Sequence, residues 1–264
     1  SFNPVGSVVG TLLCQIMILA KLEALKEQTA NATGEELLAI QSRQLSIVIL
    51  PYLIVGGILA FVWILIAVTK MPFVKESDKN VHLIPTTKRL LNNPNYVFSV
   101  VAQFFYIGAQ ISVWTYTVYY IPDQLGITGS EALKYYHTPA LIIYGVSRFL
   151  ATAIMAKVQP HNLLKVMAVL GAILTGIVII VGGQIGAIAL VGISACMSLM
   201  FPTIFGLGCR GLGEDTKIGG SGQIMAILGG ALLTPLQGYL VDIFDVRISY
   251  VIPLICFVTV ASYA

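Results

Sequence analysis

The sequence predicts an all-α membrane protein with about eight transmembrane helices. Hydrophobic residues make up 57% of its 264 residues and charged residues only 10%, whereas a soluble domain carries roughly 25% charged residues. The apolar residues gather in runs long enough to cross a bilayer, for which about 20 residues suffice. These runs are not the alternating segments of about ten residues that are typical of a membrane β-barrel.

We interpret each apolar run as a helix, because lipid offers the backbone no hydrogen-bond partners. The runs are Phe2–Ala20, Ile47–Thr69, Val97–Tyr120, Thr138–Ala156, Leu163–Val181, Gly186–Gly208, Gly219–Leu240 and Tyr250–Ala264. The sequence has no initiating Met and stops inside the last run. We therefore interpret it as a fragment of a longer protein.

The Lys and Arg residues predict which way the helices run. Most of the 15 Lys and Arg residues, but a minority of the 12 Asp and Glu residues, fall on the side that holds the loop Lys70–Tyr96. Cytoplasmic loops carry an excess of Lys and Arg. We therefore expect a multi-pass protein of the plasma (inner) membrane, with residues 70–96 in the cytoplasm.

The same loop divides the chain into two parts. It is the longest charged connection on its side, and it separates two apolar runs from six. Six helices after a basic linker are typical of the second half of a pseudo-symmetric transporter. The sequence predicts residues 1–69 as the last two helices of an N-terminal six-helix domain and 70–96 as the linker. Residues 97–264 are predicted to form a C-terminal six-helix domain whose last helix is truncated.

The run Val97–Tyr120 carries a stripe of polar and aromatic side chains. They recur at spacings of three and four: Gln103, Tyr106, Gln110 and Trp114. This spacing places them on one face of a helix. Two interpretations stay open: the stripe lines a wet cavity for a polar, ring-shaped solute, or it packs on a neighbouring helix through buried hydrogen bonds.

Other residues inside the runs are candidates for structural or gating roles. Arg148 is the one charge well inside a run, and a charge within the membrane is costly. It can snorkel or tie to a neighbouring helix end, or it can contact a substrate. Prolines bend helices, and glycines let helix backbones approach closely. The residues concerned are Pro202, Gly229, Gly230 and Pro235.

The sequence lacks recognisable catalytic motifs. It contains no GxSxG, no HExxH and no Walker loop, and no predicted helix carries paired carboxylates. Its four cysteines are isolated, which indicates neither a metal site nor a disulfide framework. The net charge of +3 is too small to indicate nucleic-acid binding. We expect no enzyme activity, no cofactor and no metal.

A neutral polar solute such as a sugar fits the stripe best. Sugars have polar edges and apolar faces, and their sites combine aromatic side chains with a few placed hydrogen-bonding groups. Tyr106 and Gln110 lie near the middle of their run, where transporter sites usually lie. Asn3 either faces the same cavity from the first run or caps a helix beside Pro4.

Four stretches of the sequence carry a resemblance. They are AQFFYIGAQISVWTY, FPTIFGLGCRGLGEDTK with the GG, TP and GYLVD that follow it, FNPVG, and SRF with PHNLL. The first resembles the seventh helix of one family, and the second resembles its tenth and eleventh helices. FNPVG resembles the fifth helix, and SRF with PHNLL resembles the eighth helix and the turn that follows it. That family is the L-fucose:proton symporters (fucose permeases), in the fucose–galactose–glucose branch of the major facilitator superfamily. The resemblance covers nearly the whole chain.

The resemblance implies a twelve-helix fold of two domains that works by alternating access, of which this chain covers helices five to twelve. It implies that Asn3 contacts sugar and that Tyr106, Gln110 and Trp114 face the cavity. Pro4 departs from the family's Ser, and Ser147 and Ala151 stand where the family usually has glycines. The family's proton-coupling carboxylates belong to its early helices.

We therefore expect a secondary active transporter that takes up L-fucose or a related monosaccharide together with protons. Protons are the expected coupling ion. The expected partners are a monosaccharide and the lipid bilayer, without nucleic acid, and the protein is expected to be a monomer. The alternatives are a glucose/galactose carrier of the same branch and a non-transporting sugar receptor on the same fold.

Overall fold

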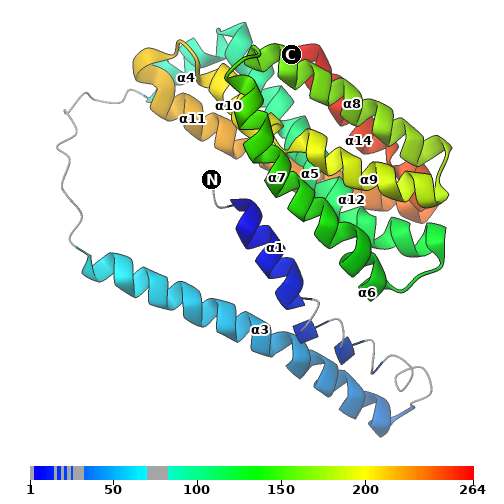
Figure 1. Ribbon diagram of the computed structural model, residues 1–264. Coiled ribbons are helices and arrows are strands. Elements are labelled where there is room, and N and C mark those ends of the chain that lie inside the picture. Colours follow the sequence, from blue (N-terminus) through cyan, green and yellow to red (C-terminus); the bar gives the residue numbers. More distant parts are fainter. Residues whose placement is uncertain (1–2, 15–16, 19–20, 23–24, 26–32, 70–82) are drawn as a thin grey trace. The chain divides into compact units, whose positions relative to one another are not determined.

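The computed structural model describes residues 3–14, 17–18, 21–22, 25, 33–69 and 83–264, and these residues are almost entirely helical (Figure 1). The chain forms two compact units. One comprises Gly6–Asn80, and the other comprises Val81–Ala264 together with Ser1–Val5. The boundary between Asn80 and Val81 falls within the sequence-predicted linker, residues 70–96. The division into two six-helix domains stays a prediction.

The first unit contains most of α1 (Asn3–Cys14) and all of α3 (Glu35–Val68). Helix α3 begins well before the predicted run at Ile47 and continues through Pro51. From Ile47 to Val68 its side chains are apolar around the whole circumference and mostly exposed, as Trp63 illustrates with 70% of its surface accessible. A helix that is apolar all round belongs in lipid or in the interior of a larger assembly.

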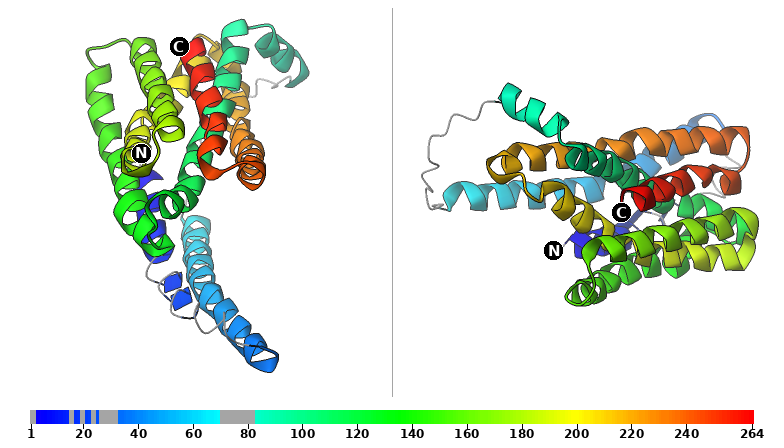
Figure 2. Two further views of the ribbon diagram at one scale, coloured as in Figure 1. Left: turned by 90° about the vertical axis from the view of Figure 1, so that its right-hand side faces the viewer. Right: turned by 90° about the horizontal axis from the view of Figure 1, so that it is seen from above.

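The second unit is a helical bundle whose helices run alongside one another (Figure 2). It starts with the short α4 (Leu83–Leu91) and the long α5 (Pro94–Leu125). Asn93 caps α5 by accepting a hydrogen bond from the Tyr96 amide, and Pro94 occupies the first turn, where its missing N–H is harmless. The other elements are α6 (Gly129–Ala132), the π-helix η2 (Leu133–His137), α7 (Thr138–Met155), α8 (Pro160–Ile180), α9 (Gly183–Met197), α10 (Met200–Cys209), the 3₁₀-helix η3 (Gly213–Asp215), α11 (Thr216–Met225), α12 (Leu228–Ile243), α13 (Val246–Ser249) and α14 (Val251–Tyr263).

Seven helical segments within the described residues are long and apolar enough to cross a membrane. They are Glu36–Val68, Pro94–Leu125, Gly129–Met155, Pro160–Ile180, Gly183–Cys209, Gly213–Ile243 and Val246–Tyr263. These segments correspond to seven of the eight predicted runs. Within the remaining run, Phe2–Ala20, the structure describes α1 and residues 17–18. The chain is a multi-pass integral membrane protein.

Helix α5 lies at the centre of the second unit. It packs against α12, α14, α10 and α9, and its buried residues Tyr106, Tyr120 and Ile121 are among the largest fully enclosed side chains of the core. Tyr120 packs edge-on against Tyr250, with ring centroids 5.3 Å apart. Helix α5 therefore serves as the frame on which the candidate site is built.

Two membrane-crossing segments are interrupted near their middle. The first break separates α9 from α10 at Ser198–Leu199. Ser198 precedes Pro202 by four residues. A break is expected there because proline has no N–H to donate to the carbonyl of residue i−4. The second break separates α11 from α12 at Ala226–Ile227. Helix α12 continues through Pro235, so the interruption of this segment does not coincide with its proline.

Gly229 and Gly230 lie just after the second break, where α12 meets α5. A Cβ atom at Gly229 would overlap the carbonyl group of Phe104, with the carbonyl carbon at 2.7 Å. A Cβ at Gly230 would overlap the side chain of Ile111. Only a residue without a side chain permits this approach of two backbones.

Helix α4 is held to the turn between α10 and α11 by an ion pair. The Arg89 guanidinium donates two hydrogen bonds to the Asp215 carboxylate, at 2.6 and 3.0 Å, and a third to the Thr86 hydroxyl. The bond to Asp215 raises the pKa of Arg89. Thr86 and Leu90 are buried beneath the helix, so α4 is anchored by packing as well as by charge.

Candidate functional site

Helix α5 presents the predicted stripe, but the structure divides its four residues into two pairs. Gln110 and Trp114 are half-buried. Gln103 and Tyr106 have no accessible surface at all. In this conformation, only the first pair has surface available to a solute.

Gln110 and Trp114 are held by side chains from two other helices. The Gln110 amide donates to the hydroxyl of Tyr144 on α7, at 3.2 Å. The Trp114 indole N–H donates to the hydroxyl of Ser194 on α9, also at 3.2 Å. The rings of Trp114 and Tyr144 meet edge to face, with centroids 5.0 Å apart. These four residues, Gln110, Trp114, Tyr144 and Ser194, form what we call the α5–α7–α9 cluster.

Tyr106 lies next to this cluster on α5. Its hydroxyl donates to the carbonyl of Met197 at 3.0 Å, next to the break between α9 and α10. Such a break leaves backbone groups that need new partners. The Tyr144 hydroxyl lies close enough to interact with that of Tyr106. Tyr106 therefore fits the packing interpretation of the stripe in this conformation, and it joins the break to the cluster.

Gln103 is fully buried and makes no hydrogen bond to any described residue through either amide atom. It lies about two turns from Gln110 along α5, because seven residues make about two turns of α-helix. It does not take part in the α5–α7–α9 cluster. The hydrogen-bonding groups of its amide are therefore not used by the cluster.

The remaining predicted residues have different placements. Helix α1 begins at Asn3, but the Asn3 side chain lies outside the part of the chain that the structure describes, so its predicted sugar contact stays a prediction. Arg148 is half-buried, one turn after Tyr144 on α7. The gating roles of Arg148, Pro202 and Pro235 stay predictions.

Tyr144 and Ser194 are members of the cluster that sequence reasoning did not single out. Tyr144 precedes Arg148 by four residues, and this spacing on one helix face was the available signal. Ser194 is one of several small residues in an apolar run, which offers no such signal. Both are buried, with Tyr144 only 3% exposed.

The cluster offers the chemistry that a neutral ring-shaped ligand needs. The bond from Gln110 to Tyr144 uses one amide N–H, and the Gln110 carbonyl oxygen takes no part in it. Trp114 and Tyr144 supply aromatic surface. Aromatic surface beside a few fixed polar groups is typical of small-molecule sites.

Known proteins resemble the chain over its full length. It is 36% identical to an L-fucose-proton symporter of Haemophilus influenzae and 31% identical to one of Escherichia coli. It covers 64% and 62% of those two proteins, which is less than two thirds. It is also 29% identical to a putative glucose/galactose transporter of Helicobacter pylori, of which it covers 63%.

One family model and one solved structure complete the comparison. Residues 67–190 match the model of the Organic Anion Transporter Polypeptide (OATP) family, which is less than half of the chain. The crystal structure of the major facilitator superfamily transporter FucP in the outward conformation superimposes with a TM-score of 0.76 at 31% identity. That match covers 99% of this chain and 65% of FucP. The chain therefore has the fold of the major facilitator superfamily and is a relative of the L-fucose-proton symporters.

Proposed function

We propose that the protein to which this chain belongs takes up L-fucose together with protons by alternating access. Relatives named L-fucose-proton symporter match every part of the chain. The single observation that carries the proposal to this chain's own residues is the α5–α7–α9 cluster, which combines a half-buried amide with a half-buried indole near the middle of a membrane helix.

The cluster suits a monosaccharide better than a charged solute. In it, Gln110, Tyr144 and Ser194 are uncharged hydrogen-bonding groups, and Trp114 offers a flat apolar face. Sugar hydroxyls donate and accept hydrogen bonds, while the C–H face of a pyranose packs on an aromatic ring. In our proposal, Gln110 binds a hydroxyl and Trp114 covers the ring. Tyr144 and Ser194 hold these two side chains in place.

The proposal includes a topology. The protein lies in the plasma (inner) membrane as a monomer, with residues 70–96 in the cytoplasm between two six-helix domains. The excess of Lys and Arg on the side of that segment supports this orientation. Protons are the coupling ion, and Asn3 contributes a further sugar contact from α1.

A glucose/galactose carrier is the second candidate. The relative from Helicobacter pylori supports it, since it matches the whole chain at 29% identity. Competition for labelled L-fucose uptake by unlabelled L-fucose, D-glucose and D-galactose separates the two candidates. Our proposal expects L-fucose to compete at the lowest concentration.

Substitutions in the cluster test the assignment of the sugar site. Labelled L-fucose uptake by cells that express the full-length protein is measured for Gln110→Ala and Trp114→Ala. We expect the apparent affinity of each variant to fall about tenfold or more, because losing one good contact of roughly 1.4 kcal/mol changes an affinity tenfold. Uptake equal to that of the wild type in both variants would rule out the assignment.

The second tryptophan of the chain provides a matched control. Trp63 lies on α3, outside the α5–α7–α9 cluster, so Trp63→Phe should keep wild-type L-fucose affinity. Trp114→Phe keeps an aromatic face but loses the N–H that Ser194 accepts. We expect this variant to lie between Trp114→Ala and the wild type, because stacking persists while the ring loses its fixed orientation.

A further inference from the structure

A group of buried polar atoms lies at the end of the second unit that carries α4. This end also holds the start of α5, the turn between α10 and α11, and the end of α14. Four side chains take part: Ser99, Gln103, Gln223 and Tyr263. They come from α5, α11 and α14, and we call them the inner polar group.

Ser99 links α5 to α11 within this group. Its hydroxyl accepts a hydrogen bond from the Gln223 amide and donates to the carbonyl of Tyr96. Tyr263 enters this end of the bundle from α14 and lines a pocket together with Ala102, the neighbour of Gln103. Opposite Ser99, Gly208 on α10 leaves room, since a Cβ there would overlap both Ser99 and Gln223. The missing side chain at Gly208 therefore lets Ser99 and Gln223 pack directly against the backbone of α10.

Four polar atoms of the group have no hydrogen-bond partner among the described residues. They are both amide atoms of Gln103, the carbonyl oxygen of Gln223 and the hydroxyl of Tyr263. Gln103 and Gln223 have no accessible surface, and Gln103 lies one helical turn from Ser99 on the same face of α5. Buried polar groups in native proteins are almost always hydrogen-bonded to protein or to ordered water.

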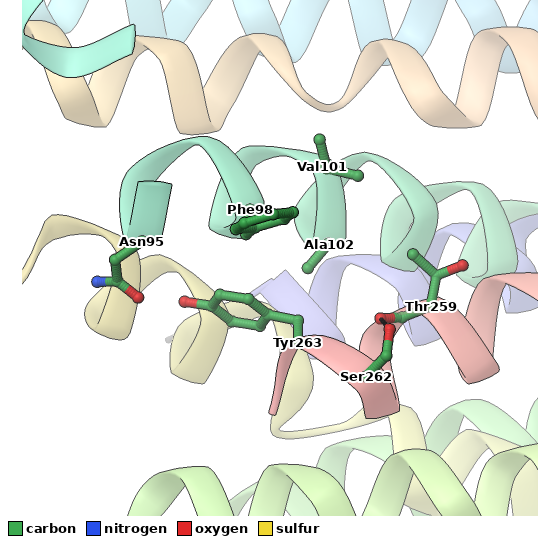
Figure 3. Close-up of a pocket in the computed structure, with 7 residues that line it drawn as sticks. All are labelled: Asn95, Phe98, Val101, Ala102, Thr259, Ser262 and Tyr263. Carbon is green, nitrogen blue, oxygen red and sulfur yellow. Dashed lines mark hydrogen bonds between the residues drawn. The ribbon is translucent and has the colours of Figure 1, made fainter. Parts of the chain in front are cut away.

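A pocket lies beside the group. It has a volume of about 380 Å³ and lies between α5 and α14. Figure 3 shows the Tyr263 hydroxyl directed toward Asn95, with Ala102, the neighbour of Gln103, near the base of the Tyr263 side chain. The lining includes the polar residues Asn95, Ser262 and Thr259. Tyr263 therefore belongs both to the lining of this pocket and to the inner polar group.

We propose that the inner polar group is an internal water site, in which ordered water bridges Gln103 to Gln223 and Tyr263. The unpartnered atoms include donors and acceptors and carry no charge, which matches water and disfavours an ion. A buried water commonly makes about three hydrogen bonds. The bound water would cross-link α5, α11 and α14 at this end of the bundle.

The direction in which Gln103→Leu changes the thermal midpoint tests the proposal. If water satisfies the Gln103 amide, Gln103→Leu expels that water and leaves the Gln223 oxygen and the Tyr263 hydroxyl buried without partners. We expect the thermal midpoint of the purified full-length protein to fall by roughly 3 °C or more. If the amide is merely unpaired, removing it relieves a penalty, and the midpoint rises. A rise would overturn the proposal.

A double-mutant cycle gives a second, independent reading. No direct hydrogen bond joins Gln103 to Tyr263, so without bridging water the effects of Gln103→Met and Tyr263→Phe should add. With bridging water, the double variant should lose clearly less than the sum of the single variants. Gln103→Met conserves volume, and Tyr263→Phe removes one oxygen, so these variants remain informative where Gln103→Leu does not fold.

A buried hydroxyl elsewhere in the bundle provides the control. Thr175 on α8 is fully buried and bonds only within its own helix, to the carbonyl of Gly171. Thr175→Val should be additive with Gln103→Met. The direct measurement is a structure of the full-length protein at a resolution that shows water. Density within hydrogen-bond distance of the Gln103 amide is expected, and a dry, closed contact there would contradict the proposal.

Discussion

The contact between Gly229 and Phe104 makes a strong prediction about how α5 and α12 pack. A Cβ atom at residue 229 would stand 2.7 Å from the carbonyl carbon of Phe104 and 3.1 Å from its Cα, and closer still to the carbonyl oxygen. These are backbone atoms and cannot turn aside. Gly229→Ala therefore forces the two helices apart, a form of overpacking that typically costs about 1–3 kcal/mol.

This cost should be visible as a lower thermal midpoint. For a protein of this size, 1 kcal/mol shifts the midpoint by about 2–4 °C, so we expect a fall of about 2–12 °C. The assay is thermal unfolding of the purified full-length protein in a mild detergent. Gly176→Ala on α8 is the matched control, because a Cβ there meets no atom within 4 Å. Equal midpoints for the two variants would refute the close approach of α5 and α12.

Two further predictions concern single hydrogen bonds. Tyr106→Phe loses the bond to the Met197 carbonyl and should lower the midpoint by about 2–4 °C, the effect of roughly 1 kcal/mol; an unchanged midpoint would mean that Tyr106 does not stabilise the break between α9 and α10. Arg89→Gln removes the ion pair with Asp215 and should raise amide hydrogen exchange in α4 while changing the midpoint little, because exposed ion pairs contribute little to global stability. Exchange in α4 as slow as in the wild type would show that packing of Thr86 and Leu90 alone anchors the helix.

The transmembrane helices could be predicted from sequence because membrane insertion depends on the local density of apolar residues. The break before Pro202 has an equally local cause, since the proline lacks an N–H. The break at Ala226–Ile227 is not followed by a proline that would explain it. It lies where Gly229 and Gly230 bring α12 against α5, and that approach depends on a helix more than a hundred residues away in sequence.

The candidate site shows the same limit. Helical spacing correctly placed Gln110 and Trp114 on one helix, but spacing cannot tell which residues of a stripe other helices will cover. Tyr106 is covered completely because the end of α9 and the start of α10 pack over it. Tyr144 and Ser194 enter the cluster only through the packing of α7 and α9 on α5. These contacts are tertiary and have no counterpart in local sequence.

Proton-coupled sugar movement is the central claim, and reconstitution of the full-length protein into proteoliposomes tests it most directly. The measurement follows labelled L-fucose uptake and the external pH together, with and without an inward proton gradient. We predict that the gradient accelerates uptake, that adding L-fucose makes the external medium more alkaline, and that Trp114→Ala weakens both effects at low sugar concentration. The account would be contradicted by L-fucose uptake that does not depend on the proton gradient and moves no protons. L-fucose binding without uptake would also contradict it.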